Sequence, residues 1–174
     1  MTAHLLHQSN VGCNAFLGGI SKNYETNLLL SEKSQYVVIE ADEFDRSFHW
    51  LTPWATVITS TDADHLDIYG TEEAYLESFA VFTELIAPGG VLLMKKGITL
   101  QPRVKPGVKL LTFGREEGDY HAKNIRIGGG EIIFDFVTKT IIIIIIILFI
   151  HAIVSVVITI ITGYVSNNRK TYKK

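Results

Sequence analysis

The sequence predicts an α/β fold in which a mostly parallel β-sheet is flanked by helices, with a small antiparallel sheet and a hydrophobic C-terminal helix. Three observations predict it. Short apolar runs rich in β-branched residues indicate strands that are buried on both faces, as in parallel sheets. An amphipathic segment between two such runs indicates a connecting helix. Two alternating runs around a glycine triplet indicate a hairpin.

The first two strands are predicted at residues 36–39 and 54–59, and a cluster of acidic residues follows each of them. The clusters are Glu40-Ala41-Asp42-Glu43-Phe44-Asp45 and Asp62-Ala63-Asp64-His65-Leu66-Asp67. If the two strands are neighbours, both clusters lie at the carboxyl edge of the sheet, where open parallel sheets bind ligands. Carboxylates there suit Mg²⁺, which takes oxygen ligands and bridges to phosphates. The competing interpretation is that both clusters are solvated turns, but their equivalent positions favour a metal and phosphate site.

The later elements follow in order. Thr71 is predicted to cap a helix whose apolar stripe continues to Ile86, and Pro88-Gly89-Gly90 ends this helix. The remaining predicted strands are residues 91–94, 108–113, 120–127 and 131–137, the last two forming the hairpin around Gly128-Gly129-Gly130.

Length and composition indicate one domain with its own core. The chain has 174 residues and a formal net charge of -2, and its mixed-sign charges provide no basic surface for nucleic acid. The single cysteine, Cys13, cannot form an internal disulfide, which is consistent with a reducing cytoplasm. Because it lies in an apolar stretch, we interpret it as a core residue and not as a nucleophile.

Three motifs carry a resemblance to a known family. They are Phe16-Leu17-Gly18-Gly19, the stretch 38–48 with its Glu40-Ala41-Asp42-Glu43 pattern, and Asp64-His65-Leu66-Asp67-Ile68-Tyr69-Gly70. Together they resemble the ATP-dependent Mur ligases, over about residues 2 to 137. The resemblance implies most of a central, P-loop-NTPase-like ATPase domain. Within the family it is strongest to the branch that joins L-alanine to UDP-N-acetylmuramate in peptidoglycan synthesis.

The resemblance also implies roles for matching residues, with ATP and Mg²⁺ as cofactors. Glu40 would bind the Mg²⁺ that bridges the ATP phosphates, and His65 would bind a second Mg²⁺. The metal ions would neutralise charge while the γ-phosphoryl group passes to the muramate carboxylate, giving an acyl phosphate that the L-alanine amine attacks. Further acidic residues would hold ligands and waters in place, namely Asp42, Glu43, Asp45, Asp64 and Asp67.

The family's glycine-rich phosphate loop, with its lysine and Ser/Thr, has no counterpart in the sequence. The stretch from Gly18 to Lys22 lacks the first glycine at the proper spacing, and we interpret it as a turn. Residues 1–8 resemble the end of the helix that follows the true loop. We therefore expect a fragment of a cytoplasmic ligase that is inactive alone, and we predict no catalytic side chain in it.

The sequence changes character after Thr138. Residues 141–161 are almost entirely apolar and include seven consecutive isoleucines. As a helix this run would be roughly 30 Å long, enough to cross a bilayer. One hypothesis is therefore a non-enzymatic, single-pass membrane-anchored protein that reuses a Mur ligase scaffold, and the other is a tail foreign to the domain. We expect residues 1–138 to be the ATP-binding domain and residues 139–174 to add nothing to its core.

Overall fold

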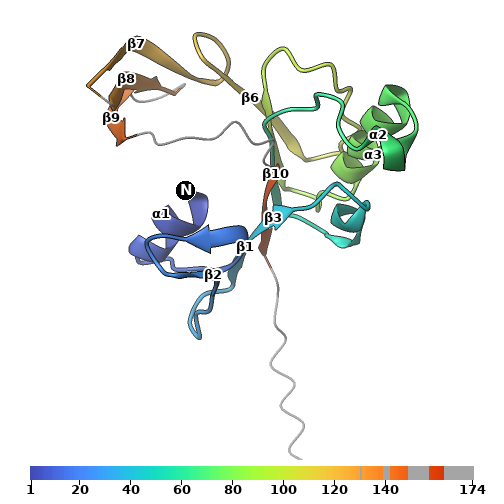
Figure 1. Ribbon diagram of the computed structural model, residues 1–174, viewed down its shortest axis with the longest axis horizontal. Helices are drawn as coiled ribbons and strands as arrows, with labels where there is room; N and C mark the ends of the chain where they lie inside the picture. Colours follow the sequence, from blue (N-terminus) through green and yellow to red (C-terminus); the bar gives the residue numbers. More distant parts are fainter. Residues whose placement is uncertain (130, 139–141, 149–156, 163–174) are drawn as a thin grey trace, which may run out of the picture.

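A computed structural model describes residues 1–129, 131–138, 142–148 and 157–162 of the chain. Within these residues one mixed sheet of ten strands runs in the order β2-β1-β3-β10-β4-β5-β6-β7-β8-β9 (Figure 1). The elements in chain order are α1 (Thr2–Gln8), β1 (Asn14–Ser21), β2 (Thr26–Leu29), β3 (Tyr36–Ala41), η1 (Ser47–Trp50), β4 (Ala55–Ile58), α2 (Leu66–Tyr69), α3 (Glu72–Glu84), β5 (Val91–Lys95), β6 (Lys109–Gly114), β7 (Tyr120–Gly128), β8 (Glu131–Val137), β9 (Ile142–Leu148) and β10 (Val157–Thr162).

The N-terminal part of the sheet carries a small core of its own. β1 pairs in parallel with β3 and antiparallel with β2. The buried residues are Ala3, Cys13, Ala15, Leu29 and Val38. Cys13 is fully buried, which confirms its predicted place in the core, and burial raises the pKa of its thiol.

The predicted turn at Gly18 and Gly19 is wrong, because both glycines lie inside β1 and the turn follows at residues 22–25. The β1–β2 register shifts between Phe16 and Ser21, so the glycines occupy an irregular part of the strand. Glycine inside a strand often marks such an irregularity or a close approach of another group.

The central strands confirm the predicted parallel sheet. β4, β5 and β6 pair in parallel along the predicted runs, and α3 follows the predicted helix. Thr71 caps α3 as expected, since its Oγ1 accepts a hydrogen bond from the N–H of Ala74 at 3.2 Å. The larger core packs around this helix, with Phe48, Tyr75, Phe79, Phe82, Ile58, Ile86 and Leu92 each almost fully buried.

The predicted hairpin is also present, because β7 and β8 pair antiparallel. It is not a separate sheet, however. β7 continues the parallel sheet through two pairs with β6, Phe113 with Tyr120 and Gly114 with His121. The small antiparallel part is therefore the outer end of the same sheet.

The predicted C-terminal hydrophobic helix is not found, since β9 and β10 are strands. Isoleucine branches at Cβ, which restricts its side chain in a helix and suits it to a strand. Residue 141 and residues 149–156 of the predicted span lie outside the described residues. In the part of the chain that the structure describes, no helix is long and apolar enough to cross a membrane.

β10 lies between β3 and β4 and runs antiparallel to both (Figure 1). Val157 pairs with Ala41 and with Ile58, the last residues of those two strands. The two strands that precede the acidic clusters were predicted to be neighbours. They are not, because β10 lies between them. Part of the tail is thus paired with the sheet through its backbone.

Candidate metal site

Glu40, the first predicted metal ligand, is hydrogen-bonded to the neighbouring strand β1. It is the penultimate residue of β3, and its Oε2 accepts a hydrogen bond from the N–H of Gly18 at 3.0 Å. The residue is exposed, so its carboxylate faces solvent at the carboxyl edge of the sheet. A carboxylate with one oxygen held and open solvent beside it can bind a cation that keeps most of its waters.

The loop after β3 is shaped by its own acidic residues. Asp42 Oδ1 accepts from the N–H of Phe44 at 3.0 Å, and Asp45 Oδ1 accepts from the N–H of Ser47 at 2.9 Å. Hydrogen bonds from the side chain and backbone of Ser47 lower the pKa of Asp45. Both carboxylates therefore fold the loop, as carboxylates commonly do in such turns.

His65, the second predicted ligand, directly precedes α2 and has a left-handed backbone with φ of 54°. The backbone N–H of His65 donates a hydrogen bond to Asp64 Oδ1 at 2.7 Å. Its imidazole Nε2 lies 3.9 Å from Glu43 Oε1, and the ring of Phe44 meets it edge-on at 5.0 Å. The loops after β3 and β4 thus come together, through Glu43 and Phe44 on one side and Asp64 and His65 on the other.

Glu43 is the most buried carboxylate of this contact, with 13% of its side chain exposed. Burial raises its pKa, while a backbone hydrogen bond and the neighbouring His65 act in the opposite direction. Its carbonyl oxygen accepts a hydrogen bond from the hydroxyl of Tyr69, and the guanidinium of Arg46 lies over the Tyr69 ring at 4.4 Å. The backbone of Glu43 is therefore held by Tyr69, whose ring in turn contacts Arg46.

The two predicted ligands have different partners, Gly18 for Glu40 and Glu43 for His65. Among the described residues, no group of three or more His, Cys, Asp or Glu side chains is arranged to hold a metal ion. Mg²⁺ needs less than that, since it often takes one or two carboxylates and completes its shell with water and phosphate. The exposed Glu40 carboxylate fits such an ion.

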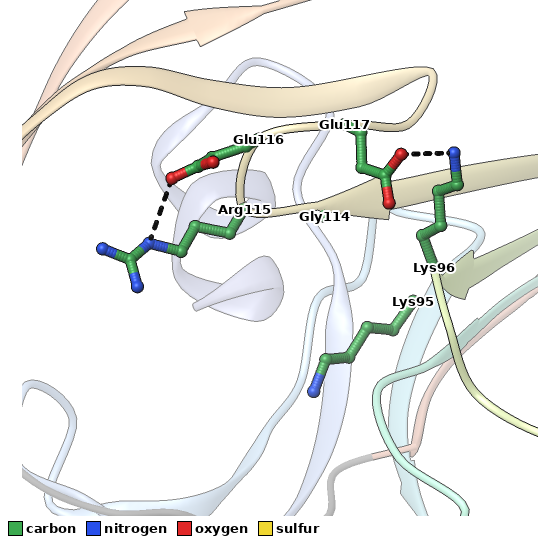
Figure 2. A pocket seen from close by; sticks show the side chains of 6 residues that line it. All are labelled: Lys95, Lys96, Gly114, Arg115, Glu116 and Glu117. Atoms are coloured by element: carbon green, nitrogen blue, oxygen red, sulfur yellow. Dashed lines mark hydrogen bonds and ion pairs between the residues drawn. The ribbon is translucent and has the colours of Figure 1, made fainter.

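Two hollows lie near the carboxyl ends of β4, β5 and β6. One, of about 320 Å³, is lined by residues 60–63, Glu72 and residues 95–99. The other, of about 650 Å³, lies between Lys95-Lys96 at the end of β5 and residues 114–117 after β6 (Figure 2). Lys95 and Lys96 line both hollows, so both contain the same two basic residues.

Of the two lysines, Lys96 forms an ion pair with a glutamate from the other wall of the larger hollow. Lys96 Nζ lies 2.7 Å from Glu117 Oε2, and Arg115 Nε lies 3.9 Å from Glu116 Oε1. Lys95 points away from the Lys96–Glu117 pair and forms no ion pair within the described residues (Figure 2). These lysines were not predicted as site residues, although they lie at the carboxyl end of a predicted strand, as the acidic clusters do.

Comparisons with known proteins agree on one family. The family model described as "Mur ligase middle domain" matches residues 1–151. A UDP-N-acetylmuramate--L-alanine ligase of Phocaeicola vulgatus is 73% identical over 138 residues, which are 79% of this chain and 30% of that protein. A ligase of the same name from Parabacteroides distasonis is 66% identical over 138 residues, with the same coverage of 79% and 30%. The chain thus spans about 30% of the length of the curated relatives it matches.

A solved structure shows a similar fold. The UDP-N-acetylmuramate-alanine ligase from Thermotoga maritima superposes with a TM-score of 0.65 and 22% identity, over 82% of this chain and 32% of that one. The predicted α/β fold with parallel central strands is thereby confirmed, whereas the predicted C-terminal helix is not found and the antiparallel hairpin extends the same sheet.

Proposed function

This chain belongs to the Mur ligase family, whose middle domain its residues 1–151 match, and we propose that it is part of an ATP-dependent ligase that joins L-alanine to UDP-N-acetylmuramate in peptidoglycan synthesis. One observation carries the proposal, the 73% identity over 138 residues to a protein of that name. Because the match covers 30% of that relative, the activity belongs to the longer enzyme, and we place that enzyme in the cytoplasm.

The proposed reaction has two steps. The γ-phosphoryl group of ATP is transferred to an oxygen of the muramate carboxylate, and ADP leaves. The amine of L-alanine then attacks the carbonyl carbon of the acyl phosphate, an amide bond forms, and phosphate leaves with the C–O electron pair.

Glu40 and His65 would hold Mg²⁺ in this reaction. A bound Mg²⁺ supplies neutralisation of the charge on the transferred phosphoryl group. The hydrogen bond from Gly18 supports this role for Glu40, because it orients the carboxylate. The contact with Glu43 supports it for His65, since a carboxylate beside a ligating imidazole helps to fix the orientation of the ring.

The domain division is also a proposal. We assign residues 1–138 to the middle domain and residues 139–174 to a hydrophobic tail with a basic end, while the family model extends to residue 151. The relatives match 138 residues of the chain, and this length supports a domain of the proposed size. No observation favours the membrane-anchored alternative.

A segment exchange tests the proposed function. Residues 1–138 replace the matching segment of the Phocaeicola vulgatus ligase, and alanine-dependent phosphate release is measured with ATP, Mg²⁺ and UDP-N-acetylmuramate. We expect turnover within about tenfold of the parent, because 73% identity preserves most contacts. Glu40→Gln in the exchanged segment should reduce it by at least about 100-fold, if Glu40 holds the metal.

The unmodified chain is the second arm of this experiment. We expect no alanine-dependent phosphate release from it, because it lacks the glycine-rich loop and matches 30% of the relatives' length. Turnover by the chain alone would overturn the proposal that it is only part of the ligase. A folded but inactive exchange protein would overturn the proposed activity.

A further inference from the structure

We propose that Gly18 is a positioning residue for the Glu40 carboxylate, an inference that rests on the proposed role of Glu40 as a metal ligand. Two independent features of position 18 carry it. The backbone N–H of Gly18 is hydrogen-bonded to the carboxylate, and the carboxylate occupies the space that any side chain at position 18 would need.

The first feature arises where the β1–β3 ladder ends. The two strands pair in parallel through Asn14 with Val37, Ala15 with Val38, and Phe16 with Ile39. Two residues beyond the last pair, the N–H of Gly18 donates to Glu40 Oε2 at 3.0 Å. Beyond the end of the ladder, the N–H of Gly18 thus has the Glu40 side-chain carboxylate of β3 as its acceptor, in place of a main-chain carbonyl of that strand. Hydrogen bonds to an ionised acceptor are about twice as strong as neutral ones, so this contact can fix the orientation of the carboxylate.

The second feature is steric. A Cβ atom at position 18 would lie 2.8 Å from both Cδ and Oε1 of Glu40, closer than real Cβ atoms approach other groups. Gly18 does not have a positive φ, so a larger residue would not strain the backbone. The carboxylate is the end of a flexible side chain and would be displaced. Alanine at position 18 should therefore move the Glu40 carboxylate and leave the strand intact.

Gly19 provides a matched control in the same strand. A Cβ atom at this position would meet nothing within 4 Å, and Gly19 likewise has no positive φ. Both substitutions to alanine add the same methyl group to adjacent residues of β1. Only the one at position 18 reaches Glu40.

The first measurement is Mn²⁺ affinity, followed by water-proton relaxation on the full chain. Residues that orient a metal ligand typically change metal affinity by 10- to 100-fold. We expect Gly18→Ala to weaken Mn²⁺ binding by at least about tenfold, and Gly19→Ala to leave it within a factor of about two. The midpoint of thermal unfolding should be the same in both variants. Adding Glu40→Asp to Gly18→Ala should restore part of the affinity, because the shorter side chain withdraws from the added methyl group.

The second measurement needs no metal. Amide hydrogen exchange at Gly18, measured by NMR, should become faster in Glu40→Ala, because the acceptor is lost. It should stay unchanged in Asp45→Ala, whose carboxylate bonds to Ser47.

The outcomes separate the two proposals. If the unaltered chain does not bind Mn²⁺, the metal role of Glu40 fails, and Gly18 exchange alone decides whether Gly18 holds the carboxylate. If Gly18→Ala binds Mn²⁺ as well as the unaltered chain, or both alanine variants lose affinity equally, the positioning role is wrong. Unchanged Gly18 exchange in Glu40→Ala would also contradict it.

Discussion

The side chain of Glu43 joins the two acidic loops, because its Oε1 lies 3.9 Å from Nε2 of His65. From the sequence, Glu43 was expected only to support the metal ligands Glu40 and His65. Glu40 instead points to β1, where Gly18 holds it. Glu40 lies in β3 and contacts the neighbouring strand β1, whereas Glu43 lies in the loop after β3 and contacts the loop after β4.

The predicted metal ligands can be tested one by one. Glu40→Gln and His65→Ala should each weaken Mn²⁺ binding by the full chain, because each removes a charged or basic donor. Glu32→Gln is the control, since Glu32 is an exposed glutamate outside both clusters. Calorimetry measures the affinities. Equal binding by all three variants would contradict the metal assignment.

A second prediction concerns Asp45, whose pKa is lowered by hydrogen bonds from Ser47. Ser47→Ala should raise this pKa toward the usual value of about 3.9. A lowered pKa in the folded state means that the stabilisation is present above the usual pKa and is lost as the pH falls through the folded-state pKa. The effect on stability should be small because the carboxylate is exposed. Carboxyl ¹³C NMR measures the pKa, and no change in Ser47→Ala would refute the assigned cause.

At the scale of elements, α3 depends on its cap. Thr71 Oγ1 accepts from the N–H of Ala74, one of the donors that a helix start leaves without a partner. Thr71→Ala should lower the free energy of unfolding by about 1 kcal/mol. Thr52→Ala is the control, because Thr52 is exposed and outside any helix. Urea denaturation measures both, and equal losses would show that the cap does not act specifically.

β10 is the element on which the sheet's continuity depends, because β3 and β4 pair with it and not with each other. A chain ending at Leu148 lacks β10, whereas a chain ending at Thr162 keeps it. We expect the shorter chain to unfold at a lower temperature and to aggregate more, since two strand edges lose their partner. Equal melting temperatures in calorimetry would restore the expectation that the tail is dispensable.

At the scale of the whole molecule, the buried residues form two clusters, and β3, which pairs with β10, contributes Val38 to one and Ala41 to the other. One surrounds Cys13 and the other surrounds α3. In the full chain, we expect the Cys13 thiol to react slowly with a thiol reagent, because it is buried and its pKa is raised. In the chain ending at Leu148, it should react faster than global unfolding allows, because the small cluster can open by itself. Identical rates in the two chains would show that the clusters do not depend on β10.

Local sequence patterns were enough to predict the type and position of most elements and to indicate the family. The strands at residues 36–41, 55–58 and 91–95 and the capped helix α3 follow from local apolar patterns and from one cap, which depend on residues near one another in the chain. The acidic motifs of the Mur ligases are likewise local. Each of these features can be recognised without knowing what lies beside it in space.

Which of these elements are neighbours became known only from the three-dimensional arrangement of the strands. The apolar segment 141–161 satisfies the pattern of a membrane helix and that of buried strands equally well. Its described parts are strands, because β9 pairs with β8 and β10 pairs with β3 and β4. The contact of Gly18 with Glu40 joins residues 22 positions apart, and that of Glu43 with His65 joins two separate loops. Such contacts depend on strand order and on the end of a ladder, which no local pattern encodes, because hydrogen-bond pairing in a sheet is made between distant parts of the chain.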